Sequence, residues 1–314
     1  MADPLLQTFQ LKHLHLKNRI ITTSHEPAYN EGGFPKDRYI AYHLERARGG
    51  IAMTMTAGSA VVSKDSPPSF DNIHAYKDEV VPWIKKLTDT IHDQDCKIMI
   101  QLTHLGRRTS WSKGDWLPSL SSGKHREPAH KAFPKVMESW DIQRIIKEYG
   151  DAAERMKLGG MDGVELEGQG HLIGQFLSPL TNELNSEYGG SLENRLRFMI
   201  EVLSDIRKKV GQDFIVGIRC VFDEVEEGGI TKSEGLKIAK ILSDSGLVDY
   251  LNVNKGRIHT DPILTKHIPI QGMKSAPHLE FAGEIKKGIN IPIFHASKIS
   301  DVASARYAIS NGLV

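Results

Sequence analysis

The sequence predicts a (β/α)8 barrel of the TIM type, an α/β fold in which a ring of parallel strands is enclosed by helices, with the eighth strand missing from this 314-residue chain. A joint of amphipathic helix, glycine stop and short apolar run recurs, for example as HLERARGG before IAMTMTA. The apolar runs are continuous, which is typical of parallel strands covered on both faces. No Gly-x-Gly-x-x-Gly motif follows the first run, which disfavours an open dinucleotide-binding sheet.

Seven strand–helix units follow one another along the chain. The strands are expected at 19–23, 51–57, 97–103, 162–167, 213–220, 248–254 and 291–296. The helices are expected at 36–49, 78–94, 141–158, 191–209, 232–245, 277–287 and 300–311. The final NGLV resembles an eighth helix-to-strand joint. Because seven strands would leave two open edges, we expect the natural chain to continue beyond Val314.

The whole of 1–314 is predicted to be one domain, with one unusually long connection. The segment 104–140 follows the third strand and is too long for an ordinary βα loop. It lies on the face where barrels build their active sites, so it predicts a lid or a substrate wall. Its three tryptophans, Trp111, Trp116 and Trp140, either anchor this loop or contact the substrate.

The composition excludes several classes of partner. The net charge is +1 without any block of like charges, which argues against nucleic acid or an anionic membrane. The N-terminal segment lacks the apolar core of a secretion signal, and no apolar run is long enough to span a bilayer, so we expect a cytoplasmic protein. Cys96 and Cys220 lie in apolar runs and predict buried free thiols, and we expect no metal site.

Polar residues gather where the predicted strands end. They stand at 23–26, 57–59, 101–104, 165–167, 219 and 252–254. Polar groups at the ends of apolar strands are costly unless they are paired or used. In a barrel these ends form the active-site face, so the sequence places its chemistry there.

Together with QFLSPLTNELNSEYGGSLENRLRF (175–198), these segments resemble the old yellow enzyme family of NADH:flavin oxidoreductases along essentially the whole chain. The pattern SPLTN…YGGSLENRxRF is highly specific, and IQLTHLGRR after the third strand is moderately so. The YGGSLENR motif itself is interpreted as structural. Ser191 is suited to cap the following helix, and Glu193 and Arg195 to pin the preceding loop.

The resemblance implies an FMN across the barrel mouth. Thr23, Ser24 and Gly58 would then lie along the flavin ring. Gln101 matches the glutamine that hydrogen-bonds the pyrimidine edge, because its amide can both donate and accept. Arg219 matches the arginine beside the flavin N1 and C2 carbonyl, where a fixed positive charge stabilises the reduced ring. An internal ion pair between Arg219 and Glu165 is the alternative, and both can hold together.

The family holds the FMN phosphate in the loops after the seventh and eighth strands. Here the seventh strand ends in His-Ala-Ser-Lys, so Ser297 and Lys298 are the candidates for the phosphate. A solvated surface lysine is the alternative for Lys298.

The chain departs from the enone reductases of this family after the fourth strand. Glu167 stands where those enzymes carry the first histidine of a substrate-binding pair, and a carboxylate would repel a developing enolate. A carboxylate suits an amine instead. His25 falls where trimethylamine dehydrogenase has histidine, and Glu26 where that enzyme has its flavin-bonding cysteine. The run from His25 to Phe70 is most similar to the amine-oxidising branch, which includes dimethylglycine and N-methylproline demethylases.

This resemblance implies oxidative demethylation of an N-methylated amino acid, with hydride transfer to flavin N5 and release of formaldehyde. Glu167, His171 or His25 would accept the amine proton, and Tyr29 would contact the substrate. A substrate carboxylate would be held by Arg107, Arg108 or Lys255. The sequence names no electron acceptor and is compatible with a homo-oligomer.

Other functions are open at this stage. An NAD(P)H-dependent enone or 2,4-dienoyl-CoA reductase of the same family is the runner-up, and a flavin-free barrel lyase or isomerase and an inactive scaffold belong to other classes. Long members of the amine-oxidising branch carry a 4Fe-4S cluster and an FAD or NAD(P) domain beyond the barrel. These are expected only if the natural chain continues beyond Val314.

Overall fold

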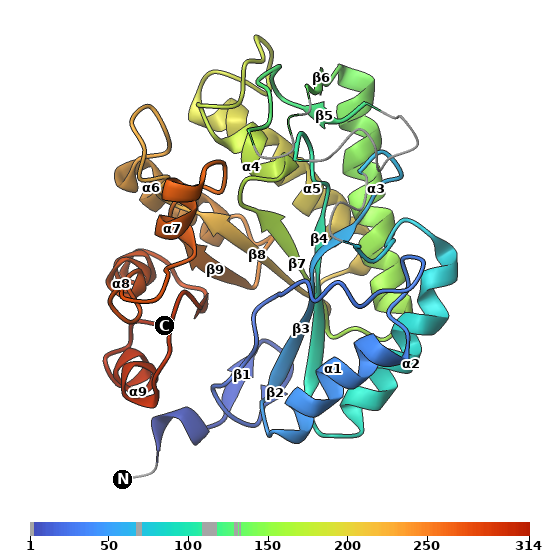
Figure 1. Ribbon diagram of the computed structural model, residues 1–314, viewed down its shortest axis with the longest axis vertical. Helices are drawn as coiled ribbons and strands as arrows, with labels where there is room; N and C mark the ends of the chain where they lie inside the picture. Colours follow the sequence, from blue (N-terminus) through green and yellow to red (C-terminus); the bar gives the residue numbers. More distant parts are fainter. Residues whose placement is uncertain (1–2, 67–70, 109–117, 129–130, 132) are drawn as a thin grey trace.

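The fold is a curled parallel sheet enclosed by helices, and the computed structural model describes the chain except for residues 1–2, 67–70, 109–117, 129–130 and 132 (Figure 1). Its six strands lie in the spatial order β10-β9-β8-β7-β4-β3, and every neighbouring pair is parallel. The strands are β3 (Met53–Val61), β4 (Lys97–Thr103), β7 (Gly163–Gly168), β8 (Ile215–Val221), β9 (Tyr250–Asn254) and β10 (Ile293–His295). Spatial order follows chain order without reversal, as in a (β/α)8 barrel.

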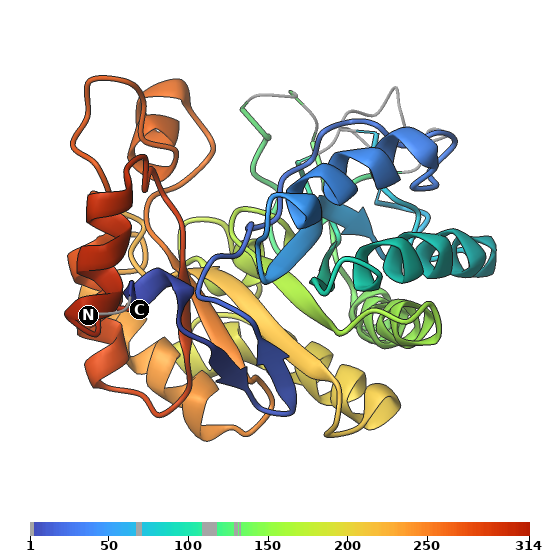
Figure 2. The same ribbon diagram turned by 90° about the horizontal axis from the view of Figure 1, so that it is seen from below.

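The helices lie on the convex outside of the sheet (Figures 1 and 2). All seven predicted helices are confirmed with ends shifted by a few residues. They are α1 (Asp37–Arg48), α2 (Val81–His92), α3 (Ser139–Leu158), α5 (Leu192–Val210), α6 (Lys232–Asp244), α8 (Leu279–Lys287) and α9 (Val302–Ser310). Among these described helices, none combines the length and apolar character that a bilayer crossing requires.

Short elements that the sequence pattern did not predict complete the fold. The helical ones are η1 (Pro4–Leu6), α4 (Leu172–Leu177) and α7 (Asp261–His267), whereas η2 (Asp78–Val80) is a 3-10 turn at the start of the predicted helix 78–94. The strands are the antiparallel pair β1 (Phe9–Leu11) and β2 (Leu14–Leu16) and the parallel pair β5 (Leu120–Ser121) and β6 (Lys135–Val136). Elements of two to seven residues are too short to show a hydrophobic period.

The predicted strand at 19–23 is wrong as a regular strand. Ile21 forms a single parallel bridge with Met53, supported by hydrogen bonds from Thr22 N to the Met53 oxygen at 3.1 Å and from Ala52 N to the Ile20 oxygen at 2.9 Å. The segment thus runs beside β3 in the place of a first strand. In the part of the chain that the structure describes, no strand pairs with its other side. A pocket of about 360 Å³ lies there, lined by Ile21 and by residues of β10.

The β1–β2 hairpin closes the lower end of the sheet (Figure 2). Leu11, Leu14 and Leu16 are buried in one apolar cluster with Met53 and Met99 from the starts of β3 and β4. Because this end is filled with side chains, the polar face of the barrel is the opposite one, at the carboxyl ends of the strands. Cys96 and Cys220 are buried free thiols, as predicted.

The YGGSLENR motif is structural, as interpreted. Ser191 Oγ accepts from Asn194 N at 3.3 Å and caps α5. Arg195 donates from Nε to the Leu177 oxygen at 2.8 Å and from Nη1 to the Gly190 oxygen at 2.6 Å. The guanidinium therefore joins the start of α5 to the end of α4, and α4 begins directly behind the tip of β7.

Candidate active site

Four adjacent strands bring polar side chains together around one buried carboxylate inside the barrel. Glu165 on β7 accepts from Gln101 Nε2 at 2.8 Å, from the Tyr250 hydroxyl at 3.0 Å and from Asn252 Nδ2 at 3.0 Å. Burial raises the pKa of Glu165, while the charge of Arg219 and these hydrogen bonds oppose the shift. Gln101 and Arg219 thus flank the same group inside the barrel. Among the described residues no ion pair within 4 Å joins Arg219 to Glu165, and Arg219 acts on Glu165 through its charge alone.

Several polar atoms at this end are buried without a partner among the described residues. They are Gln101 Oε1, Arg219 Nε and Nη1, Asn252 Oδ1 and His295 Nε2. Each such atom costs about 1–3 kcal/mol unless a ligand satisfies it. They come from β4, β8, β9 and β10, and they combine acceptor oxygens with guanidinium donors. This donor set fits the mixed N–H and carbonyl edge of a flavin ring.

His295 is a neutral imidazole in this group. Burial lowers the pKa of His295 to about 4, and its Nδ1 lies 3.1 Å from the Val253 oxygen. The proton therefore resides on Nδ1, and Nε2 presents a lone pair. Asn252 and His295 were noted in the sequence only as strand-end residues, because no motif distinguished them from structural polar groups.

Glu167 stands two residues beyond Glu165 on β7 and is only 4% exposed. Its Oε1 accepts from Gln169 N at 2.8 Å and its Oε2 from Gln169 Nε2 at 3.2 Å. Gln169 Oε1 in turn accepts from Asn254 Nδ2 at 2.8 Å. Burial raises the pKa of Glu167 to about 8, although the charge of Arg219 opposes the shift. A carboxyl group that carries a proton near neutral pH is a typical acid–base candidate.

The two histidine candidates lie in different surroundings. His171 precedes α4, is 7% exposed, and its Nδ1 lies 3.0 Å from Thr103 Oγ1 at the end of β4. His25 is exposed. Its neighbour Glu26 is partly buried, with Oε1 accepting from Ala28 N at 3.0 Å, and burial raises the pKa of Glu26 to about 8. Glu26 is thus a second protonated carboxyl at the barrel rim.

The predicted rim residues are positioned by packing. A Cβ at Gly58 would lie 2.9 Å from Glu26 N, so the glycine lets the segment that carries Thr23 and Ser24 pass close to β3. Thr23 and Ser24 are half-buried. The Tyr29 ring is covered by the Arg38 guanidinium at 3.8 Å and meets Tyr42 edge-on at 5.7 Å, so Tyr29 is held against α1.

Ser297 and Lys298 follow β10, both with left-handed backbone at φ 78° and 55°. The Ser297 hydroxyl lies 3.0 Å from His278 Nδ1. Lys298 Nζ donates to the carbonyl oxygens of Ile270 and Met273, each at 2.5 Å. In this structure the ammonium group is therefore used by the preceding loop, and phosphate binding would require it to exchange those partners.

The residues predicted to bind a substrate carboxylate differ in the contacts that they make in the structure. Lys255 is paired with Asp223 at 2.9 Å. Arg107 is 8% exposed and donates from Nη1 to the His125 oxygen at 3.3 Å. Trp140 belongs to α3, is exposed and donates to Glu138 Oε2 at 3.0 Å, so it contacts no site residue described above. Trp111 and Trp116 lie outside the described residues.

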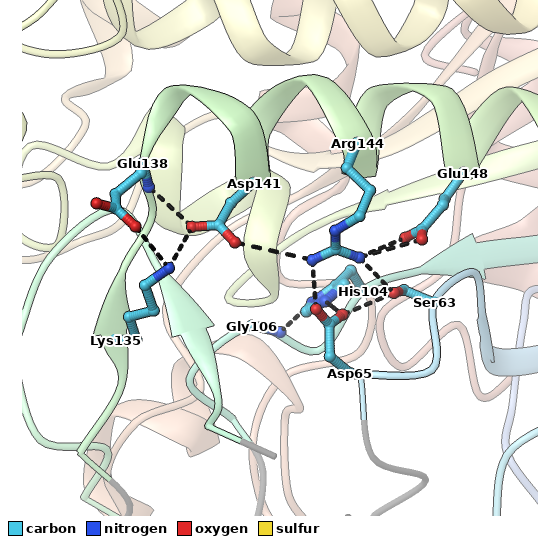
Figure 3. A network of polar contacts seen from close by, with 9 residues as sticks. All are labelled: Ser63, Asp65, His104, Gly106, Lys135, Glu138, Asp141, Arg144 and Glu148. Carbon is cyan, nitrogen blue, oxygen red and sulfur yellow. Dashed lines mark hydrogen bonds and ion pairs between the residues drawn. The ribbon is translucent and has the colours of Figure 1, made fainter.

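A polar network that the sequence did not predict fixes the loop after β4 (Figure 3). His104 donates from Nε2 to Asp65 Oδ1 at 2.9 Å, and His104 Nδ1 accepts from Gly106 N at 3.0 Å. Asp65 is also bonded by Ser63 Oγ at 2.6 Å and by Arg144 of α3. The network joins the loops after β3 and β4, which are far apart in sequence.

The fold and this site define a flavin-binding oxidoreductase barrel, and the chain belongs to the NADH:flavin oxidoreductase / NADH oxidase family, whose model matches residues 4–312. It is 65% identical over 312 residues to a probable N-methylproline demethylase of Rhizobium meliloti (strain 1021). It is 45% identical over 314 residues to the multifunctional alkene reductase/demethylase OYE of Caballeronia cordobensis. These alignments cover 99% and 100% of this chain and 46% of each relative.

A solved 2-naphthoyl-CoA reductase has the same fold. It superposes with a TM-score of 0.93 at 26% identity over 100% of this chain and 49% of that one. The chain spans about half the length of the two curated relatives named above, since the alignments cover 46% of each. Family membership confirms the predicted resemblance, supports FMN as the cofactor and removes the flavin-free lyase or isomerase as an alternative.

Proposed function

We propose that this chain is the FMN-binding part of an oxidoreductase that demethylates an N-methylated amino acid of the N-methylproline or dimethylglycine type. The observation that carries the proposal is the buried carboxyl group of Glu167 at the carboxyl end of β7. In its carboxylate form such a group stabilises a cationic amine and repels an enolate. The similarity to a probable N-methylproline demethylase supports the same substrate class.

The residues proposed to hold FMN are those with unpartnered polar atoms. Gln101, Arg219, Asn252 and His295 would contact the ring, with Thr23, Ser24 and Gly58 along its edge, and Ser297 and Lys298 would hold the phosphate. When bound, FMN accepts a hydride from the N-methyl carbon of the substrate. Arg219 contributes a fixed positive charge on the buried side of the ring site, because two of its N–H groups have no protein partner within the described ranges.

Glu167 is proposed to take the proton from the substrate nitrogen. The ammonium form of the substrate has no lone pair to expel the hydride, so it must lose its proton first. The ammonium group and the Glu167 carboxylate are both penalised by burial, so proton transfer to Oε2 removes two charges from a low-dielectric site. Oε2 is the less tightly bonded oxygen, with Gln169 Nε2 at 3.2 Å. Water then hydrolyses the substrate iminium to formaldehyde and the demethylated amine.

The neighbouring groups have secondary roles in this proposal. His171 is fixed between β4 and β7 and would orient the substrate beside Glu167, whereas the exposed His25 could relay the proton to solvent. Tyr29 would border the substrate from the α1 side. If the natural chain continues beyond Val314, a 4Fe-4S cluster and an FAD or NAD(P) domain there would receive the electrons. We also propose a cytoplasmic location and assembly as a homo-oligomer.

The experiment is an anaerobic titration of the flavin-loaded full-length protein. N-Methylproline and dimethylglycine are each added, the visible flavin absorbance is followed, and formaldehyde is measured. We expect bleaching of the flavin with equimolar formaldehyde, and no bleaching by proline, which lacks the methyl group. The proposal is overturned if neither methylated amino acid reduces the flavin while cyclohexenone is reduced at the expense of NAD(P)H. That result would favour the alkene reductase activity that the Caballeronia cordobensis relative also carries in its name.

A further inference from the structure

A small charged pocket lies at the rim of the barrel next to Gln169, the residue that hydrogen-bonds Glu167. Its volume is about 40 Å³. Its walls come from the loops that follow β4, β7, β8 and β9, so it opens on the face of the barrel that carries the candidate active site. The polar residues that line it and bear on the inference are Arg107, Arg108, Glu127, Gln169, Glu224 and Arg257.

The pocket is strongly charged. Three guanidinium groups line it together with the carboxylates of Glu127 and Glu224, and Glu226 adds a third carboxylate through its ion pair with Arg257. Arg257 is already paired, with Glu224 at 3.2 Å and with Glu226 at 2.5 Å. Glu224 is used as well, since its Oε2 accepts from Ser178 Oγ and from Ile230 N, both at 2.8 Å.

Arg107 is nearly buried and has no direct carboxylate contact in the described ranges. It is 8% exposed, and its guanidinium donates to the His125 oxygen at a long 3.3 Å without a carboxylate within 4 Å in the described part of the chain. Burial lowers the pKa of Arg107 and the charge of Arg257 acts in the same direction, while the more distant charges of Glu127, Glu183 and Glu224 oppose the shift. A nearly buried guanidinium without a counter-ion is costly unless a ligand supplies the anion.

The backbone that presents Arg107 is fixed from two sides. Gln175 Oε1 accepts from Arg107 N at 3.1 Å, and Gln175 Nε2 donates to the Leu105 oxygen at 3.2 Å. On the other side, Gly106 N is bonded to His104, which is itself held by Asp65 (Figure 3). Gly106 has φ +61°, and a Cβ there would lie 2.3 Å from Gln175 Oε1. A guanidinium on such a rigid turn loses little entropy when it binds an anion.

We infer that Arg107 binds the carboxylate of the amino-acid substrate in this pocket, next to Gln169 and Glu167. The inference rests on the proposed function and adds the group that recognises the amino-acid end of the substrate. A carboxylate ligand would give this guanidinium the direct anionic contact that it lacks in the described part of the chain. A cavity that holds one water molecule has a volume of roughly 10–15 Å³. The pocket, with about 40 Å³, therefore has room for a carboxylate but not for the diphosphate of a nucleotide. Arg107 would bind both oxygens of the carboxylate, as a planar guanidinium does.

The test compares substrates with and without a carboxylate. The flavin-loaded full-length protein is assayed with N-methylproline and with N-methylpyrrolidine as wild type, Arg107→Met and Arg107→Lys. We expect Arg107→Met to lower the preference for N-methylproline, measured as the ratio of the two kcat/KM values, about 10- to 100-fold, since a hydrogen bond to a charged group contributes roughly 1.5–3 kcal/mol. Arg107→Lys, which keeps the charge and loses the fork, should lie between.

Arg126→Met is the matched control. Arg126 belongs to the same long loop and is exposed, with Nε bonded to the Lys131 oxygen at 3.0 Å, and its removal should leave the ratio unchanged. Flavin content and circular dichroism check that each variant folds. Calorimetric binding of L-proline, pyrrolidine and inorganic phosphate gives a readout independent of turnover. Wild type should bind proline and not pyrrolidine, and Arg107→Met should lose proline binding.

The outcomes separate the two proposals. If Arg107→Met lowers kcat/KM by the same factor for both substrates, or if wild type prefers neither, the carboxylate site is wrong while the demethylase function stands. If neither substrate is oxidised, the proposed function fails, and calorimetry still decides whether Arg107 binds a carboxylate. Binding of phosphate in preference to proline would also overturn the inference.

Discussion

Gln101 Nε2 donates to Glu165 Oε1 at 2.8 Å, and this bond determines which end of the Gln101 amide is left for a ligand. The free end is the carbonyl oxygen, which has no partner among the described residues and suits a ring N–H donor. The same bond helps to separate the two inward carboxyl groups of β7. Glu165 accepts from three donors on two other strands, β4 and β9, and supports the site, whereas both hydrogen bonds of Glu167 come from Gln169.

Arg219→Met is predicted to weaken FMN binding about 10- to 100-fold without destabilising the apoprotein. Two N–H groups of Arg219 are buried without a protein partner in the described ranges, so the guanidinium contributes through the ligand and not through the fold. Fluorescence titration of the apoprotein with FMN measures the affinity, and thermal unfolding measures the stability.

Arg207→Met is the matched comparison, because this guanidinium is satisfied within the protein. Arg207 pairs with Asp249 at 2.6 Å and donates to the Phe214 oxygen at 2.6 Å. Its loss should lower the melting temperature of the apoprotein. The affinity for FMN should change only as far as the lower stability reduces the folded fraction. Equal FMN affinity in wild type and Arg219→Met would contradict the assignment of Arg219 to the flavin.

Glu167→Gln is predicted to remove the alkaline rise of the reaction. A base must be deprotonated to accept a proton, and burial raises the pKa of Glu167 to about 8, so kcat/KM for N-methylproline should increase with pH up to that value in wild type. The amide isostere should lower kcat on the order of 10²- to 10⁴-fold and flatten this limb. Stopped-flow reduction of the flavin between pH 6 and pH 10, with steps of roughly one unit, follows both effects. An unchanged limb in Glu167→Gln would transfer the role to another group, with Glu26 next in line.

The same substitution is predicted to stabilise the protein at high pH. A glutamate loses its proton near 4.5 in the unfolded chain and near 8 in this site, so between these values the folded state holds a proton that the unfolded state has lost. The free energy of unfolding of wild type therefore falls as the pH rises through that window. The free energy of unfolding of Glu167→Gln should not fall in this way. Relative to wild type it should therefore increase by on the order of 1–3 kcal/mol from acid to alkaline pH, as measured by urea unfolding. Glu154→Gln, an exposed change on α3, should show no such trend.

The strands and the inward residues were predictable because both depend on local patterns. Continuous apolar runs marked β4 and β7, and side-chain alternation along a strand placed Glu165 and Glu167 on the inner face. The segment at 19–23 failed for a reason that its own residues do not encode. A strand needs a ladder of repeated bridges with a neighbour, and in the described residues this segment forms one bridge, between Ile21 and Met53.

Partners distant in sequence were the part that the pattern could not give. Lys298 donates to the carbonyl oxygens of residues 25 and 28 positions earlier in the chain. The sequence His-Ala-Ser-Lys contains no indication of these partners. Gly58 was attributed to the flavin ring, but the structure shows that its missing Cβ also makes room for Glu26. The contact between Asp65 and His104 spans 39 residues and depends on how two loops meet above the sheet.

Asp65→Asn is predicted to loosen the turn that carries Arg107. Burial by itself raises the pKa of Asp65, but the hydrogen bonds of His104 and Ser63 and the charge of Arg144 outweigh it, so the pKa lies well below its usual range. Such a group contributes stability that is present above the unfolded pKa of about 3.8 and is lost as the pH falls below it. Asp65→Asn should cost about 1–3 kcal/mol at neutral pH, and the difference from wild type should shrink in acid.

The effect of Asp65→Asn should extend to the substrate, because His104 Nδ1 accepts from Gly106 N and that proton pattern depends on Nε2 donating to Asp65. We expect KM for N-methylproline to increase several-fold, on the order of 1 kcal/mol, while KM for N-methylpyrrolidine changes less. Asp141→Asn is the control within the same network. Asp141 holds Lys135 at 2.8 Å and does not contact His104, so its loss should reduce stability without changing the ratio of the two KM values (Figure 3). If both variants change that ratio alike, the network stabilises the fold in general and does not position Arg107.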